Sequence, residues 1–143
     1  MIAPRSAEYD SLLDFRHRTF ASSDVLSTSG WLYPMTWLKS KGMNVESFFS
    51  KHLITGSHDR AIEAVRSGMV DGAAVDSLVF RQLMLEDPSL TNAVQIVQQS
   101  DSFGMPPLVV PEGLDSGLAD GLKEVLMQMH EEAEGRSILK ALS

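Results

Sequence analysis

The stretch Val70-Asp71-Gly72-Ala73-Ala74-Val75-Asp76-Ser77 decides the fold class of this chain. Residues 70–75 predict a strand, and its run of Ala73, Ala74 and Val75 lacks the apolar–polar alternation of a strand with one wet face. A continuous apolar run is typical of a parallel strand that helices cover on both faces. The strand ends at Asp76-Ser77, and the apolar spacing over residues 78–85 predicts a helix directly after it.

The same order of strand, polar junction and helix occurs twice earlier in the chain. Residues 18–23 predict a strand before a helix over 29–41, and residues 52–55 predict a strand before a helix over 59–67. Pro34 lies too deep in the first of these helices for the first helical position, so we expect an irregular start there. Alternating strands and helices favour an α/β fold with a mostly parallel sheet.

The remaining segments extend this unit at both ends. We expect a single α/β domain over residues 1–143, in which residues 1–17 form an entry segment and residues 18–105 carry the strands and helices. A fourth strand is expected over 94–99. The segment 106–143 is expected to be extended at 106–110 and then helical, with an apolar stripe over 114–129 and a short helix over 136–142.

Composition excludes several classes of protein. At 143 residues with 43% hydrophobic and 22% charged residues, the chain is an ordinary globular domain and not a disordered tail. The net charge of -7, without a basic cluster, excludes nucleic acid as a partner. The absence of cysteine excludes disulfides and thiolate chemistry. No apolar run approaches the ~18 residues of a membrane span and the start is not a secretory signal, so as written the chain is expected to stay where it is made.

Polar side chains stand at the carboxyl end of each of three predicted strands. Because such ends meet at one edge of a parallel sheet, we expect these side chains to converge there. The amides that begin a helix lack internal partners, hydroxyls add donors, and a glycine lets a bulky oxyanion approach the backbone. The sequence therefore predicts an anion site, and its candidate ligand-binding residues are Ser27, Thr28, Ser29, Gly30, Ser57, His58, Asp76 and Ser77.

Each of these residues also has a purely structural interpretation. Ser57 and Asp76 can cap the helices that follow them, and His58 can be a surface residue in the first turn of its helix. Near a helix N-terminus the dipole disfavours an imidazolium, so a functional His58 is expected to donate as a neutral ring. The tryptophans Trp31 and Trp37 are expected to lie in the core, and the histidines His17, His52 and His130 are expected to be solvated.

No enzyme, metal or cofactor is predicted. Ser29, His58 and Asp76 are the ingredients of a nucleophilic triad, but Thr28-Ser29-Gly30 lacks the leading glycine of a G-x-S-x-G nucleophile elbow. No pair of His, Asp or Glu residues has the spacing of metal ligands.

Three stretches of the chain resemble the phosphonate- and phosphite-binding proteins of ABC transporters, which have the type II periplasmic solute-binding fold. They are residues 20–34 with the motif S-T-S-G, residues 55–59 with T-G-S-H-D, and residues 70–77, and residues 114–142 are similar to the closing helices of that family. The resemblance implies two α/β lobes that clamp a ligand between them. This chain would supply the second lobe at 18–105, and a crossover strand with the C-terminal helices at 106–143.

The resemblance also implies roles for individual residues. Ser27, Thr28, Ser29 and His58 would hold the oxygens of a phosphonate, phosphite or phosphate anion, and Asp76 would face the variable substituent, where an ammonium group would pair with it. It further implies an extracytoplasmic, periplasmic location and an ABC permease as partner of a full-length protein. A single lobe cannot enclose a ligand, so weak binding is expected.

A second hypothesis is a sensory or protein-interaction module of a signalling protein, derived from the same fold. The apolar stripe of the C-terminal helices adds a separate expectation. An exposed stripe over residues 118–129 predicts self-association of the chain, by exchange of these helices between copies.

Overall fold

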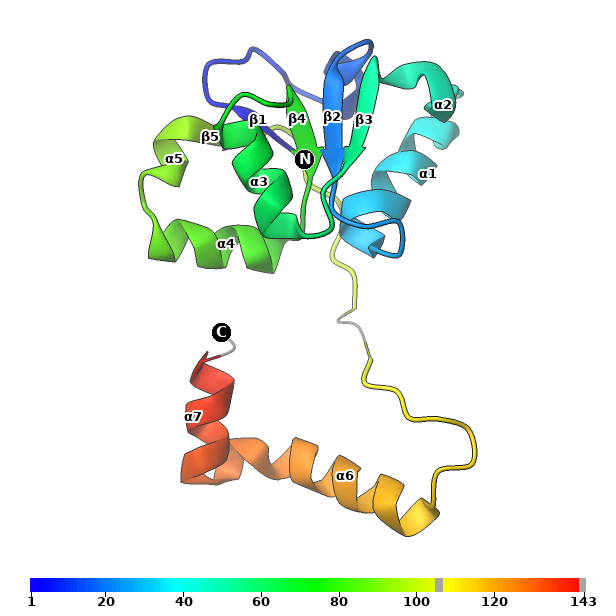
Figure 1. The fold of residues 1–143 in the computed structure, drawn as a ribbon, viewed down its shortest axis with the longest axis vertical. Helices are drawn as coiled ribbons and strands as arrows, with labels where there is room; N and C mark the ends of the chain where they lie inside the picture. Colours follow the sequence, from blue (N-terminus) through cyan, green and yellow to red (C-terminus); the bar gives the residue numbers. More distant parts are fainter. Residues whose placement is uncertain (105–106, 142–143) are drawn as a thin grey trace. The chain divides into compact units, whose positions relative to one another are not determined.

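Five short strands form one mixed sheet in the order β3-β2-β4-β1-β5 (Figure 1). The computed structural model describes residues 1–104 and 107–141, and its strands are β1 (Ile2–Pro4), β2 (Thr19–Ser22), β3 (Lys51–Ile54), β4 (Gly72–Ala74) and β5 (Val94–Ile96). β2 pairs in parallel with β3 and with β4, whereas β1 pairs antiparallel with β4 and β5. The predicted α/β fold and its three parallel strands are therefore confirmed.

The strand β1 lies in a segment where the sequence predicted none. It sits between β4 and β5, with Ile2 opposite Ala73 on one side and Ile96 on the other. Residues 1–17 also contain the 3₁₀-helix η1 (Leu12–Phe15), which Ser11 and Asp14 cap reciprocally. These residues and the sheet form one compact unit, Met1–Asp101, and the rest of the chain forms a second unit, Ser102–Ser143.

Helices cover both faces of the sheet in the first unit (Figure 1). Successive residues of a strand point to opposite faces. Accordingly, Ala21 and Ala73 belong to the core under α3, whereas Phe20 and Ala74 belong to the core under α1. Burial on both faces explains why the run at residues 73–75 does not alternate. The helices are η2 (Thr28–Leu32), α1 (Tyr33–Ser40), α2 (Val45–Phe48), α3 (His58–Arg66), α4 (Ser77–Glu86) and α5 (Leu90–Ala93).

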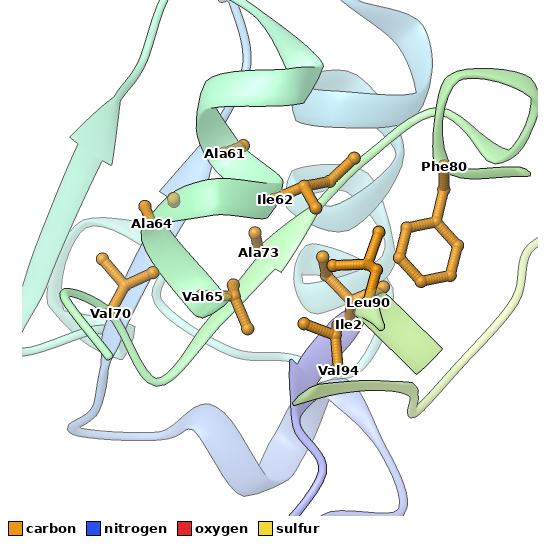
Figure 2. Packing of buried hydrophobic residues seen from close by; sticks show 11 residues of the cluster. Ile2, Ala61, Ile62, Ala64, Val65, Val70, Ala73, Phe80, Leu90 and Val94 are labelled. Carbon is orange, nitrogen blue, oxygen red and sulfur yellow. The ribbon is translucent and has the colours of Figure 1, made fainter. Parts of the chain in front are cut away.

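The core under α3 is built from small and branched side chains. The four apolar residues within the predicted helix over 59–67, Ala61, Ile62, Ala64 and Val65, are all buried. Figure 2 shows them packed with Phe80 of α4, Leu90 of α5 and strand residues. Full burial of a side chain such as Ile62 contributes about 1.5–3 kcal/mol, so this face anchors the helix that begins at His58.

The core under α1 is aromatic. Phe20 stacks on Phe49 with ring centroids 4.5 Å apart, and Phe15 meets Phe20 edge-on at 5.2 Å. Gly72 begins β4 where a Cβ would lie 2.0 Å from the Phe15 ring, so glycine is required for this packing. The tryptophans Trp31 and Trp37 pack against the same cluster, which confirms their predicted place in the core.

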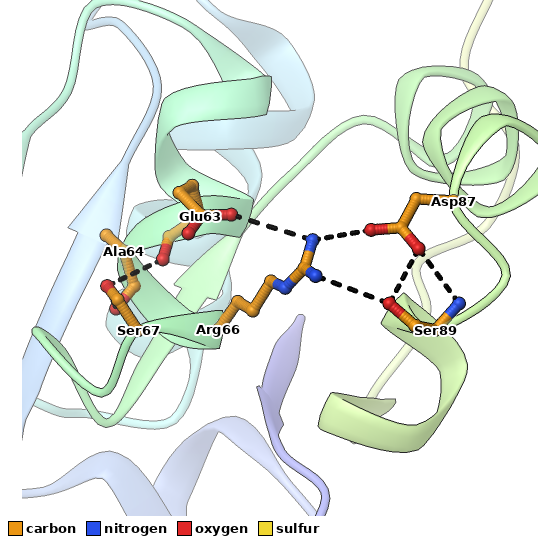
Figure 3. A network of polar contacts seen from close by, with 6 residues as sticks. All are labelled: Glu63, Ala64, Arg66, Ser67, Asp87 and Ser89. Carbon is orange, nitrogen blue, oxygen red and sulfur yellow. Dashed lines mark hydrogen bonds and ion pairs between the residues drawn. The ribbon is translucent and has the colours of Figure 1, made fainter.

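A polar network joins the C-terminal end of α3 to the turn between α4 and α5 (Figure 3). Arg66 Nη1 lies 2.7 Å from Asp87 Oδ2, and Arg66 Nη2 donates to Ser89 Oγ at 3.3 Å. Hydrogen bonds from Ser89, and then the Arg66 guanidinium, hold the pKa of Asp87 below its usual range. These groups are exposed, so the network adds little to stability.

The irregular start predicted ahead of Pro34 is confirmed. The segment η2 is a π-helical turn in which Leu32 N–H donates to Ser27 O at 3.0 Å, before α1 continues as an α-helix. Leu32 belongs to the apolar pattern of the predicted helix over 29–41, but its side chain is 54% exposed. The wider i to i+5 turn shifts the phase of the apolar pattern by one residue.

The second unit contains α6 (Ser116–Gln128), the 3₁₀-helix η3 (Met129–Glu131) and α7 (Ala133–Ala141). The two predicted C-terminal helices are thus confirmed within the described residues, although Leu142 lies outside them. Residues 107–110 form no regular structure, and Pro106 lies outside the described residues. The apolar stripe of α6 is exposed within the unit. In the part of the chain that the structure describes, no helix combines the length and apolar character needed to span a membrane.

Candidate functional site

Hydrogen bonds join the three predicted strand-to-helix junctions at one edge of the sheet. Ser27 Oγ lies 3.4 Å from His58 Nε2, the Asp76 backbone N–H donates to His58 Nδ1 at 3.0 Å, and Ser29 Oγ donates to Asp76 Oδ2 at 3.3 Å. Because Ser27 and Ser29 both lie at the start of the same turn, these contacts close a ring. The predicted convergence of Ser29, His58 and Asp76 is therefore confirmed.

The opening of η2 presents donors on its outer side. Ser27 caps this turn, and its Oγ accepts the Gly30 N–H at 3.0 Å. Thr28 and Ser29 are the first two residues of the turn, so their N–H groups have no acceptor within the helix. These amides stand at the positive end of the helix dipole, which favours a negative charge beside them.

The two ring nitrogens of His58 have different roles. Nδ1 accepts the Asp76 N–H, so in the neutral ring the proton is on Nε2, which faces the Ser27 hydroxyl. Burial lowers the pKa of His58, while the nearby carboxylates of Asp76 and Asp59 partly oppose that shift. His58 is therefore a neutral donor, as the helix dipole led us to expect. Since Ser27 Oγ already accepts from Gly30 and faces this N–H, its own proton can be donated outward.

Asp76 combines the structural interpretation with the functional one. Its Oδ1 accepts the Leu78 N–H at 2.8 Å and caps α4, while its Oδ2 accepts the Ser29 hydroxyl. The carboxylate is half-buried at the rim of the site. Because the Ser29 hydroxyl proton is donated to Asp76, the oxygen atoms of these two side chains can only accept further hydrogen bonds from a neighbouring group.

Gly30 lets these groups approach one another. It is buried, and a Cβ at this position would lie 2.0 Å from Ser23 Oγ and 3.1 Å from His58 Cε1. Any side chain at residue 30 would therefore displace either the Ser23 side chain or the His58 ring. The glycine predicted for close approach of an anion has, in addition, a packing role.

The other three predicted residues border this ring without a hydrogen bond that ties them to it. Ser57 is the N-cap of α3, half-buried and without a side-chain capping bond. Thr28 and Ser77 are exposed, and Ser77 is the first residue of α4. The predicted capping role of the Ser57 hydroxyl is thus not observed, while that of Asp76 is.

Sequence reasoning missed two residues that support the site. Ser23 is 2% exposed, and its Oγ lies against Gly30 without a hydrogen-bond partner among the described residues. His52 was expected to be solvated, and that prediction is wrong. It is half-buried because its ring stacks on Trp31, with Ser22 Oγ 2.8 Å from its Nε2. Two serines directly after the buried residues Phe20 and Ala21 were the available signal for this buried polar layer.

The candidate site is an open rim. Two hollows in the described residues, of about 300 and 310 Å³, lie elsewhere: one between α3 and α4, the other beside β5. Neither is lined by Ser27, Ser29, His58 or Asp76. No group of three or more His, Cys, Asp or Glu side chains suited to a metal ion occurs in the described part of the chain.

The family model described as "ABC transporter, phosphonate, periplasmic substrate-binding protein" matches residues 1–143. A curated relative from Prochlorococcus marinus (strain MIT 9301), named a probable ABC transporter phosphite binding protein, PhnD1, is 28% identical over 116 residues. That match covers 78% of this chain and 38% of the relative.

Solved structures agree with this match. A binding protein component of an ABC phosphonate transporter from Pseudomonas aeruginosa has a TM-score of 0.87 at 25% identity, over 99% of this chain and 48% of its own. PhnD1 from Prochlorococcus marinus in complex with methylphosphonate has a TM-score of 0.75 at 22% identity, over 97% and 56%. These neighbours have type II periplasmic-binding-protein folds. The chain spans about half the length of these structures.

Proposed function

This chain belongs to the family of periplasmic substrate-binding proteins of phosphonate ABC transporters, and on that premise we propose that it binds a small phosphorus oxyanion at the rim formed by Ser27, Ser29, His58 and Asp76. The family is one of transporter solute-binding proteins and not a class of enzymes. The observation that carries the proposal is the Asp76 N–H on His58 Nδ1, which aims a neutral Nε2–H donor at the start of a helix.

The donors suit a tetrahedral anion. The amides of Thr28 and Ser29, the outward proton of Ser27 and the Nε2–H of His58 are all donors, and hydrogen bonds from them to an anion are charge-assisted. Gly30 keeps the backbone of the turn open to a bulky oxygen cluster. These donors act locally, so the acidic net charge of the chain, screened over roughly 8 Å in physiological salt, does not oppose the binding.

The Asp76 carboxylate determines which anion is accepted. A fully deprotonated oxyanion beside it would be repelled, whereas a ligand with a P–OH proton or an ammonium group can donate to it. We therefore propose preference for a singly protonated phosphonate, phosphite or phosphate over a sulfonate of the same shape, which has no proton to donate at neutral pH.

The wider setting follows from the family and belongs to the same proposal. We propose that the chain works in the periplasm, delivering its anion to an ABC permease, within a binding protein of which it corresponds to about half. Because the site is an open rim, the affinity of this chain alone is expected to be low. Self-association through the C-terminal helices stays a prediction.

Isothermal titration calorimetry tests the proposal with methylphosphonate, phosphite and phosphate, and with methylsulfonate as the control ligand. We expect saturable binding of the phosphorus anions and at least about tenfold weaker binding of methylsulfonate, as for a lost charge-assisted hydrogen bond. Ser27→Ala and His58→Ala should each weaken binding, while His130→Ala, an exposed histidine of the second unit, should not. Equal heats for all four ligands, or for the wild type and the two rim variants, would reject the assignment.

A further inference from the structure

His52 occupies an unusual position for a histidine on an edge strand. Its ring lies parallel to the Trp31 indole, with centroids 4.9 Å apart and an interplanar angle of 9°. On its other sides are Phe49, at 5.1 Å, and Phe20, its partner across the strand pair, at 6.0 Å. A hydrogen bond with Ser22 Oγ, 2.8 Å from Nε2, holds the His52 ring in place among these aromatic side chains.

Trp31 belongs to the turn that forms the candidate site. It directly follows Gly30, and its N–H donates to Ser27 O at 3.1 Å, an acceptor it shares with the Leu32 N–H at 3.0 Å. Ser27 is also the cap of the turn. The backbone of Trp31 is therefore part of the turn that carries the amides of Thr28 and Ser29.

This turn needs support from outside itself. A π-helical turn is a rare conformation, found mostly as a single turn within an α-helix and frequently at functional sites. Within it, the Trp31 and Leu32 N–H groups share the Ser27 carbonyl, and the Tyr33 N–H donates to Thr28 O. On the sheet side, His52 supplies a flat ring against the indole, and Ser23 Oγ lies against Gly30.

We propose that His52 is a positioning residue for the oxyanion site: by stacking on Trp31 it holds the turn 28–32 in the shape that presents its amides to the ligand. The proposal rests on the proposed function for its ligand, but the support of the turn can be measured without one. His52 does not belong to the hydrogen-bonded ring of Ser27, Ser29, His58 and Asp76. It acts on the site through Trp31.

Two variants separate the stack from the polar contact. His52→Phe keeps a flat ring for Trp31 and loses the bond to Ser22, whereas His52→Leu removes both. His130→Leu makes the same change at an exposed histidine and serves as the matched control. Amide hydrogen exchange of Trp31 and Leu32, measured by NMR, reports on the turn, and the amides of α3 report on the fold as a whole.

In His52→Leu we expect exchange of the Trp31 and Leu32 amides to be about three- to tenfold faster and methylphosphonate binding to be weaker by a similar factor, the size of one lost ring contact. Exchange in α3 should not change. His52→Phe should remain within about twofold of the wild type in both measurements, because a stacked ring pair is kept.

The possible outcomes separate the two proposals. Unchanged exchange and affinity in His52→Leu would overturn the positioning role, as would equal losses in His52→Phe and His52→Leu, which would assign the effect to the Ser22 contact. Faster exchange at Trp31 in His52→Leu, together with no binding of methylphosphonate by the wild type, would support the positioning of the turn and refute the proposed function. Affinity lost in His52→Leu with unchanged exchange would also contradict the mechanism.

Discussion

His52 lies on β3 and His58 begins α3, the helix that follows this strand, and burial lowers the pKa of both. Their surroundings differ. His58 is surrounded by a hydroxyl, a backbone amide and a carboxylate, whereas His52 is surrounded by aromatic rings and one serine hydroxyl. The first set offers hydrogen-bonding groups and the second mainly ring faces. This difference is the basis for proposing that His58 contacts the ligand and that His52 supports the turn.

Gly30 packs against the His58 ring and directly precedes Trp31, on which His52 stacks, so its substitution should have the largest effect. In Gly30→Ala the new Cβ would collide with Ser23 Oγ and press on the His58 ring, and would also displace the adjoining Trp31. We expect a loss of about 1–3 kcal/mol in the free energy of unfolding, typical of overpacking, and a loss of measurable methylphosphonate binding. Denaturant unfolding and calorimetry check this. Gly121→Ala in α6, where a Cβ has open space, is the control. Wild-type affinity in Gly30→Ala would contradict the importance of the close packing of Gly30 against Ser23 and His58.

Substitution of His58 should remove a contact with the ligand while the stacking of His52 on Trp31 still supports the turn. In His58→Ala the Nε2–H donor is lost, and we expect about 10- to 100-fold weaker methylphosphonate binding, the range for a hydrogen bond to a charged group. The exchange of the Trp31 and Leu32 amides should stay close to that of the wild type. This pattern is the reverse of a purely structural defect. Faster amide exchange in His58→Ala with unchanged affinity would mean that His58 supports the turn and does not contact the ligand.

How far the sequence predicted this site depends on the kind of contact. The convergence of Ser29, His58 and Asp76 was predictable because each follows a strand, and parallel strands end at one edge. The strand β1 was not, because Ile2, Ala3 and Pro4 form too short a segment for a pattern, and its partners lie about 70 to 90 residues away.

The support of the turn by His52 could not be predicted from the sequence either. Residues 51–54 of β3 are exposed, half-buried, half-buried and exposed, which is not the alternation that would have marked His52 as inward. Its partner Trp31 comes from a helix, and only the observed phase of the π-helical turn brings the rings together. Pro34 predicted that the helix start is irregular. It did not predict which residue the irregularity would turn toward the sheet.

The pH dependence of stability should depend on both histidines. Since burial lowers the pKa of each ring in the folded state, the unfolded chain takes up protons first as the pH falls below about 6.5, and the free energy of unfolding should decrease there. Burial also lowers the pKa of the Met1 amino group to about 6, which lowers stability as the pH falls from about 8. Comparing wild type with His52→Phe at each pH cancels the Met1 contribution. A difference between the two proteins that does not change with pH would contradict a buried, neutral His52.

Substitution of Arg66 should have the smallest effect. Arg66 is the last residue of α3, the helix whose first residue is His58, and its exposed network with Asp87 and Ser89 lies outside the ring. In Arg66→Ala we expect methylphosphonate affinity within about twofold of the wild type, because exposed ion pairs contribute little. Calorimetry checks this. A large loss would mean that the position of His58 depends on the far end of its helix.

The central claim is that a phosphorus oxyanion binds at the opening of η2 beside a neutral His58. A ¹⁵N NMR titration of the wild-type chain with methylphosphonate tests it most directly. We predict saturable shifts of the Thr28, Ser29 and Gly30 amides together with the His58 Nε2 resonance, which should remain that of a protonated nitrogen in a neutral ring. Saturable shifts confined to other parts of the chain, or no shift at these four groups, would contradict the claim.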